Sequence, residues 1–344
     1  MKNQWSKNER RKRKRSSLFI LGGNAMDRTV IKPRSWFWLG LVCTSMLVPR
    51  GIAFGFQQGS PNPTRESSAR SSLDVELLAE EQYRLGLAYL KSPQSTEKAV
   101  EHLEKAVELV GNSAEYHFRL GEAYARDFSY ANILRKPFIA TKMRAQLELA
   151  VRFAPSSIEF REALIQYYVL APTVLGGSFE KAREQADALR RVDPYFSLLA
   201  YANISAEEGD HEKANAFYLR AIQVRPSTWQ AYQRYGTYCL STYEIDRAIQ
   251  QFQKYVELSP DTAASYEHLA GAYVRKRMYD LAIDSYLKAV EKDRSLTQLI
   301  FRVAQLYEFK GSPREAKRYY AEYLKFSPNG RLAEDARTKL AELK

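Results

Sequence analysis

A step of 34 residues recurs through the second half of the chain, and it constrains the fold more than any other feature. Small residues, alanines and aromatics each keep this step between residues 195 and 330. The small residues are Ala202, Gly236, Ala270 and Ala304, the alanines are Ala214, Ala248, Ala282 and Ala316, and the aromatics are Tyr218, Phe252, Tyr286 and Tyr320. Self-similarity at this period indicates stacked copies of one small unit.

Each unit is predicted to contain two antiparallel helices. In unit 229–262, residues at helical spacing predict a first helix over 228–241 and a second over 245–258. Gly236 is expected where the two helices approach closely, facing Ala248. Proline cannot continue a helix, so Pro260 ends the second one. One pair cannot bury its apolar face alone, and the pairs must therefore stack.

This pattern resembles the tetratricopeptide repeat (TPR), a helix–turn–helix unit. The resemblance implies an all-α fold, a right-handed superhelical solenoid of about seven units. The array is expected over residues 73–330, with a capping helix over 331–344 that covers the open end. It also implies a binding role without naming the partner.

Two units depart from the regular period. The second contains an apolar insertion around residues 127–141, which is either a local cap packed on the array or an element that contacts a partner. The third has an enlarged turn over 171–178. There Pro172 is expected to end the first helix, Gly176 and Gly177 to allow positive φ, and Ser178 to cap the second helix.

The positive charge of the chain is concentrated before the repeats. The net charge is +12; residues 1–72 hold 14 basic and 3 acidic residues, or +11, and the remainder holds 38 and 37, or +1. The repeat region is therefore almost neutral, and a nucleic-acid role for the array lacks electrostatic support.

The segment before the repeats has the features of an export signal. Residues 1–25 are predicted to be a basic disordered leader, unless translation starts at Met26. Residues 26–56 place basic residues before a mostly apolar core of 13 residues at 36–48, which is short for a bilayer span of about 20 residues but suits a signal peptide. We expect 57–72 to be a flexible linker. These features predict a periplasmic or secreted protein, or one anchored in the inner membrane through 36–56 with its array outside the cytoplasm.

No catalytic pattern is present in the sequence. The four histidines have no metal-ligand spacing that we recognise, and Cys239 occupies a position that is normally buried, where a structural thiol is expected rather than a nucleophile. We therefore predict a protein that is not an enzyme, with no catalytic residue, no bound metal and no cofactor.

The resemblance also implies a ligand surface. In TPR arrays the first helices line a concave face, and the usual ligand positions are the second, fifth, ninth and twelfth of each unit. Ligand contacts are predicted at the fifth and ninth positions; the alternative is that several of these side chains pack inside the superhelix. The residues predicted to bind a partner there are Tyr83, Phe118, Glu122, Glu162, Gln166, Asn203, Gln233, Thr237, Glu267, Phe301 and Gln305. No unit has the Lys and Asn pair of a chaperone-type carboxylate clamp.

The expected partner is a protein or peptide segment. Phe118 and Phe301 are the predicted anchors, because an aromatic offers a large buried area with few rotors to freeze. Glu122 and Glu162 favour a ligand with Lys or Arg. The sequence thus predicts an exported scaffold that assembles partners in a bacterial envelope; the alternatives are a membrane-tethered assembly factor and a regulatory subunit of an enzyme complex.

Overall fold

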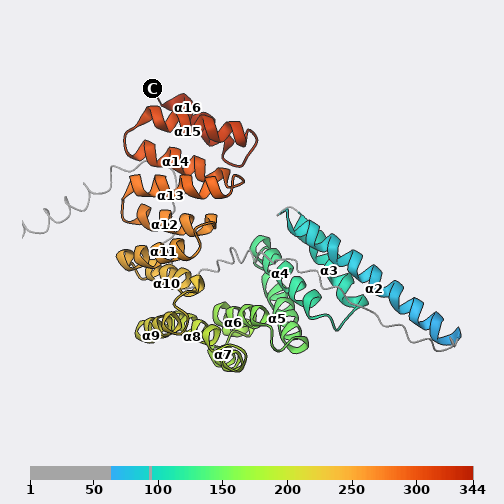
Figure 1. Ribbon diagram of the computed structural model, residues 1–344. Helices are drawn as coiled ribbons and strands as arrows, with labels where there is room; N and C mark the ends of the chain where they lie inside the picture. The colour runs from blue at the N-terminus through green and yellow to red at the C-terminus, as the bar shows by residue number, and fades with distance from the viewer. Residues whose placement is uncertain (1–62, 93–94, 344) are drawn as a thin grey trace, which may run out of the picture. The chain divides into compact units, whose positions relative to one another are not determined.

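The computed structural model describes residues 63–92 and 95–343, and the regular elements in these ranges are helices (Figure 1). In chain order they are α2 (Pro63–Leu90), α3 (Thr96–Leu109), α4 (Ala114–Tyr130), α5 (Lys136–Phe153), α6 (Ile158–Leu170), η2 (Thr173–Leu175), α7 (Phe179–Val192), α8 (Pro194–Glu208), α9 (His211–Val224), α10 (Trp229–Ser241), α11 (Ile245–Leu258), α12 (Ala263–Arg275), α13 (Tyr279–Lys292), α14 (Thr297–Phe309), α15 (Pro313–Phe326) and α16 (Ala333–Glu342). The predicted leader and export segment, residues 1–56, lie outside the described residues.

The helices pack as pairs in chain order. Each first helix packs on the second helix of its own unit, from α2 with α3 to α14 with α15, and each second helix packs on the next first helix. Over the described ranges this makes seven units, which confirms the all-α solenoid of helix pairs. Helix α16 packs on α15, and its buried residues are Ala333 and Ala336.

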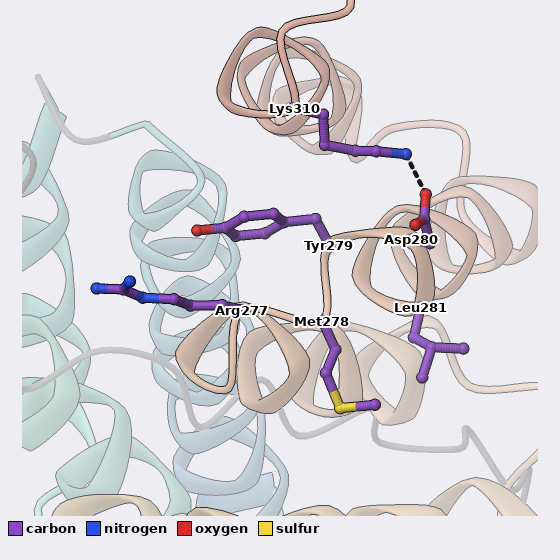
Figure 2. A pocket seen from close by; sticks show the side chains of 6 residues that line it. All are labelled: Arg277, Met278, Tyr279, Asp280, Leu281 and Lys310. Carbon is purple, nitrogen blue, oxygen red and sulfur yellow. Dashed lines mark hydrogen bonds and ion pairs between the residues drawn. The ribbon is translucent and has the colours of Figure 1, made fainter.

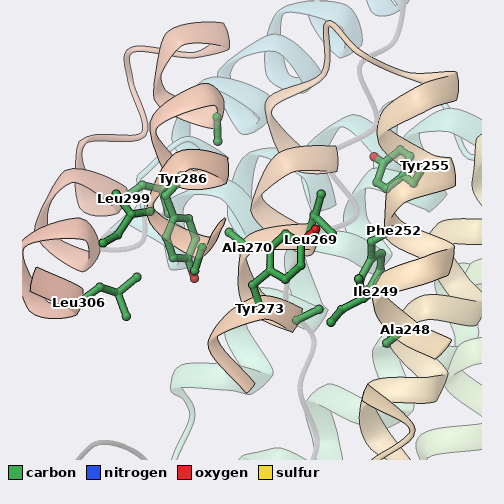
Figure 3. Close-up of a cluster of buried hydrophobic side chains, with 14 of the residues drawn as sticks. Ala248, Ile249, Phe252, Tyr255, Leu269, Ala270, Tyr273, Tyr286, Leu299 and Leu306 are labelled. Carbon is green, nitrogen blue, oxygen red and sulfur yellow. The ribbon is translucent and has the colours of Figure 1, made fainter. Parts of the chain in front are cut away.

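A continuous apolar core runs between neighbouring units from Tyr195 to Ala336 (Figure 3). Alanines of the repeat, such as Ala248, are fully buried. The close approach predicted at Gly236 is confirmed, but the ring of Phe252 rather than Ala248 lies over it: an added Cβ would fall 2.6 Å from Phe252 Cε1. The same ring stacks on His268 of the next unit at 5.2 Å. Phe252 therefore joins its own two helices and also the following pair.

The helix bounds predicted for unit five agree with the structure. The first helix begins at Trp229 and the second spans Ile245–Leu258. In the enlarged turn of unit three, Gly176 has φ 89°, and Ser178 Oγ accepts a hydrogen bond from Lys181 N at 3.2 Å. A Cβ on Gly177 would lie 1.7 Å from the carbonyl oxygen of Ala171. Gly176 is thus required by its positive φ. The positive φ predicted at Gly177 is wrong, and a side chain is excluded there by the close approach of Ala171 instead.

Part of the predicted linker is helical. Helix α2 begins at Pro63, inside the segment 57–72 that the sequence predicted to be flexible. Proline is favoured at the first position of a helix, because its fixed φ is helical and its missing N–H has no intrahelical acceptor there. The composition of the segment did not predict that a helix starts there.

The apolar insertion of unit two lengthens both of its helices. Helix α4 continues to Tyr130 and α5 begins at Lys136. Four side chains at this hairpin tip are 65–81% exposed: Tyr130, Ile133, Leu134 and Phe138. The tip therefore does not form a cap packed on the array.

Candidate functional site

The fifth and ninth positions of α2, α4, α6, α8, α10, α12 and α14 form what we call the first-helix face. First helices of successive units contact one another directly, as α6 does with α8, α8 with α10, and α10 with α12. Side chains at these positions can therefore meet across units. Each predicted partner-binding residue lies on this face, but its residues differ in what they contact.

Two predicted aromatic anchors are buried in the core. Phe118 is 3% exposed and stacks on Phe160 with ring centroids 4.5 Å apart. Phe301 is 5% exposed and meets Tyr320 edge-on at 5.2 Å. The prediction that these rings anchor a ligand is wrong, because at the fifth position of their units the ring turns between the helices rather than outward.

Units one and two are joined by a polar network. Tyr83 donates to Glu115 Oε1 at 3.1 Å, and Tyr83 stacks on Tyr116 at 4.8 Å. The guanidinium of Arg119 donates to both Glu115 and Glu122, at 2.7 Å each. Burial raises the pKa of the Glu122 carboxyl, against the opposing effect of Arg119. Two of the predicted residues, Tyr83 and Glu122, are therefore held by partners inside the array.

A bidentate ion pair joins units three and five. Arg234 Nη1 and Nη2 donate to the two carboxylate oxygens of Glu162 at 2.6 and 2.9 Å. The two residues are 72 positions apart in the chain, and their side chains are only 31% and 17% exposed. Parallel hydrogen bonds of this kind are among the stronger charge-assisted contacts. Both carboxylate oxygens of Glu162 thus bind Arg234 rather than a ligand.

Two further predicted residues also have internal partners. The amide of Gln233 lies 3.3 Å from His268 Nε2. Burial lowers the pKa of His268, so the neutral imidazole is favoured at this contact. Thr237 Oγ1 donates to the Gln233 carbonyl in its own helix at 2.9 Å.

Four predicted residues keep their hydrogen-bonding capacity. Among the described residues they make no side-chain hydrogen bond and no ion pair, and each is half-buried. They are Gln166, Asn203, Glu267 and Gln305. These four side chains are the part of the predicted site that remains able to receive a ligand.

Four arginines of this face were not among the predicted residues. Arginine directly follows the fifth position in four of the units, as Arg84, Arg119, Arg234 and Arg302. Arg119 and Arg234 neutralise predicted ligand-binding carboxylates. The recurrence at one position was visible in the sequence and could have pointed to these internal pairs.

Neither a membrane span nor a metal site is found in the part of the chain that the structure describes. No helix there combines the length and apolar character needed to cross a bilayer. No group of three or more His, Cys, Asp or Glu side chains there could hold a metal ion. The buried thiol of Cys239 has its pKa raised to about 12, mainly by burial, as expected of a structural cysteine.

Comparison with known proteins identifies the repeats. One family model described as tetratricopeptide repeat matches residues 244–296, and a second with the same description matches 197–228 and 297–329. The chain therefore carries tetratricopeptide repeats, the class of helical repeat that its period and helix pairs define.

Three known proteins are similar over parts of the chain. It is 28% identical over 227 residues to Superkiller complex protein 3 of Mus musculus, which covers 63% of this chain and 14% of that protein. It is 26% identical over 143 residues to Anaphase-promoting complex subunit 3 of Schizosaccharomyces pombe, covering 39% and 21%. A crystal structure of the APC/C hetero-tetramer Cut9–Hcn1 is 17% identical with a TM-score of 0.43, covering 76% and 54%. The chain thus matches only a small part of the two longer relatives.

Proposed function

We propose that this protein is a scaffold that binds an extended protein or peptide segment along the first-helix face and so assembles a complex. The proposal rests on four polar side chains of that face that make no side-chain hydrogen bond and no ion pair in the described part of the chain: Gln166, Asn203, Glu267 and Gln305. An amide side chain can both donate and accept, so it can pair with the main chain of an extended peptide.

Charge favours a ligand with basic residues near units two and three. Glu115 and Glu159 lie within electrostatic reach of Glu122 there, and Arg119 pairs with Glu115 and Glu122. Two negative charges of this group are left without a matching cation. A Lys or Arg side chain of the ligand would balance one of them.

A role in an assembly is supported by the relatives. The names of both similar proteins place them in multi-subunit complexes, and helical repeats of this kind offer extended surfaces for partners. The alternative roles of regulatory subunit and membrane-tethered assembly factor use the same surface.

We place the scaffold outside the cytoplasm, in the envelope of a bacterium or secreted from it. The proposal rests on the basic flank and short apolar core within residues 26–56. N-terminal sequencing of the mature protein tests it: cleavage after Ala53 or Gly55 is expected for export, and an intact leader on a membrane-bound chain would favour the anchor. Full-length protein free in the cytoplasm would contradict both.

Removal of two neighbouring amides tests the binding face. The double variant Gln166→Ala/Asn203→Ala should recover less partner than the wild type in a quantitative pull-down from the native cells, because both side chains lie in units that contact each other. The matched control is Gln223→Ala/Gln250→Ala, which removes two exposed amides from second helices.

Circular dichroism must first show equal helicity for the wild type and both variants. Equal recovery of the same partners by both double variants would exclude the first-helix face as the binding surface. The exposed hairpin tip of unit two would then be the next surface to test.

A further inference from the structure

Four repeat turns share one backbone geometry. Between the first and second helices of units four to seven, residues 209, 243, 277 and 311 have φ values of 83°, 63°, 61° and 69°. In each turn the next residue donates its N–H to a carbonyl five residues earlier, at 2.8–2.9 Å. A left-handed residue at this point closes the first helix, and glycine adopts that conformation at the lowest cost.

Two of these four positions carry a large side chain instead of glycine. Gly209 and Gly311 occupy the turn in units four and seven, whereas Tyr243 and Arg277 occupy it in units five and six. Positive φ is unfavourable for a bulky residue, and such strain gathers at functional positions. In the described part of the chain neither side chain makes a hydrogen bond, ion pair or ring contact. Neither side chain therefore stabilises its turn through such a contact, and both are exposed.

A shallow hollow lies beside Arg277. It has a volume of about 280 Å³ and is lined by Arg277, Met278, Tyr279, Asp280, Leu281 and Lys310. Figure 2 shows that the guanidinium of Arg277 points away from the Asp280–Lys310 ion pair. Met278 and Leu281 are 38% and 41% exposed. The hollow thus combines an apolar surface with a guanidinium that has no acidic partner.

Neighbouring lysines are paired where Arg277 is not. Lys276 pairs with Asp246, and Lys310 pairs with Asp280. The first of these pairs also brings the turn of unit six beside the start of α11, which directly follows the turn with Tyr243. Tyr243 is 70% exposed. One edge of the array therefore presents an exposed aromatic, an apolar hollow and an uncompensated positive charge.

We propose that this edge, formed by Tyr243, Arg277, Met278 and Leu281, is a second docking surface for an acidic protein segment. The segment would place an Asp or Glu next to a large apolar side chain. Its carboxylate would pair with Arg277 in a charge-assisted contact, and its apolar side chain would cover Met278 and Leu281. The surface is separate from the first-helix face and does not depend on the ligand bound there.

Binding of defined peptides to the full-length protein tests the proposal. The probe is a library of synthetic dodecapeptides in which Asp or Glu precedes Leu or Phe, with Asn or Gln copies as the matched set. The wild type should select the carboxylate peptides. Arg277→Gly should weaken the selected peptide by at least about tenfold, and Tyr243→Gly by at least about threefold.

The Tm of each variant shows whether weaker binding comes from a lost contact or from unfolding. Because glycine removes the left-handed strain, each glycine variant should keep its Tm or gain roughly 2–4 °C. The control Arg220→Gln removes an exposed, unpaired cation from α9 and should bind the peptide within about twofold of the wild type. The variant Gln166→Ala/Asn203→Ala should also bind it normally.

Three results would overturn the proposal. The library could yield no ligand, the Asn and Gln copies could bind as well as the carboxylate peptides, or Arg277→Gly could bind like the wild type. A dimer in solution that Arg277→Gly dissociates would instead assign this edge to a second copy of the chain.

Discussion

Gly236 shows how one residue position sets the distance between two helices. The nearest atoms to its missing side chain belong to Phe252, which is fully buried. The same relation recurs in units one and two, where an added Cβ on Gly86 or Gly121 would meet a leucine of the second helix at 2.6 or 3.0 Å. The small residue at this position is therefore required by the packing of the two helices in these units.

Gly236→Ala should lower the free energy of unfolding by about 1–3 kcal/mol, since the added methyl group overpacks a filled core. Gly271→Ala is the matched control, because Gly271 also lies within a helix and an added Cβ would meet nothing within 4 Å. That control should gain about 0.5–1 kcal/mol from the better helix propensity of alanine. Urea unfolding measures both, and equal effects would contradict the packing argument.

His268 is expected to make stability depend on pH. Burial lowers its pKa from 6.5, so the folded state favours the neutral ring. Its contribution is fully present above the unfolded pKa and is lost as pH falls below it. The Tm of the wild type should fall more between about pH 7.5 and about pH 5 than the Tm of His268→Gln. Parallel pH profiles would show that His268 has no such role.

Pairs of helices are joined by contacts that no single unit contains. The ion pair of Glu162 and Arg234 joins α6 to α10 past the intervening α8. It is largely shielded from solvent, unlike the exposed pair of Lys254 and Glu257 within α11. Loss of one partner leaves the other charge poorly solvated, so the shielded pair should be the stronger constraint on how these units stack.

A double-mutant cycle measures that difference. Arg234→Met and Glu162→Gln should each destabilise the array by roughly 1–3 kcal/mol, with a coupling energy of about 0.5–3 kcal/mol. The same cycle on Lys254→Met and Glu257→Gln should give a coupling of at most about 0.5 kcal/mol. A coupling for the Arg234 pair no larger than this surface value would show that the contact does not hold units three and five together.

At the scale of the whole molecule, the 34-residue step was sufficient to predict the fold. It predicted both ends of helix α11 correctly, and it predicted the close helix approach at Gly236. Both features follow from packing within a unit. It did not show that Phe118 and Phe301 point into the core, nor that Glu162 meets Arg234. Those contacts depend on how successive units rotate against each other, and a repeat period carries no information about that rotation. The strained turns at Tyr243 and Arg277 stood in register with Gly209 and Gly311, and this comparison was available before the structure.

The tyrosine-rich core should make the array sensitive to alkali. Burial is the main cause that raises the pKa of Tyr167 and Tyr238 from 10.0 to about 12 and that of Cys239 from 9.0 to about 12. The unfolded chain ionises these groups first, so their contribution to stability is complete below about pH 9 and is lost as pH rises toward 12. Urea unfolding at about pH 8 and about pH 11 should show a lower free energy of unfolding at the higher pH.

Single tyrosine variants assign this effect to the buried groups. Tyr167→Phe removes one group that must stay protonated in the fold, together with its 2.6 Å hydrogen bond to the Leu175 carbonyl. It should therefore be less stable than the wild type at about pH 8 but lose less stability between about pH 8 and about pH 11. Tyr243→Phe, at an exposed turn, should leave the pH dependence unchanged. If Tyr167→Phe and Tyr243→Phe lose the same free energy over this range, the alkaline sensitivity arises from groups other than the buried phenols.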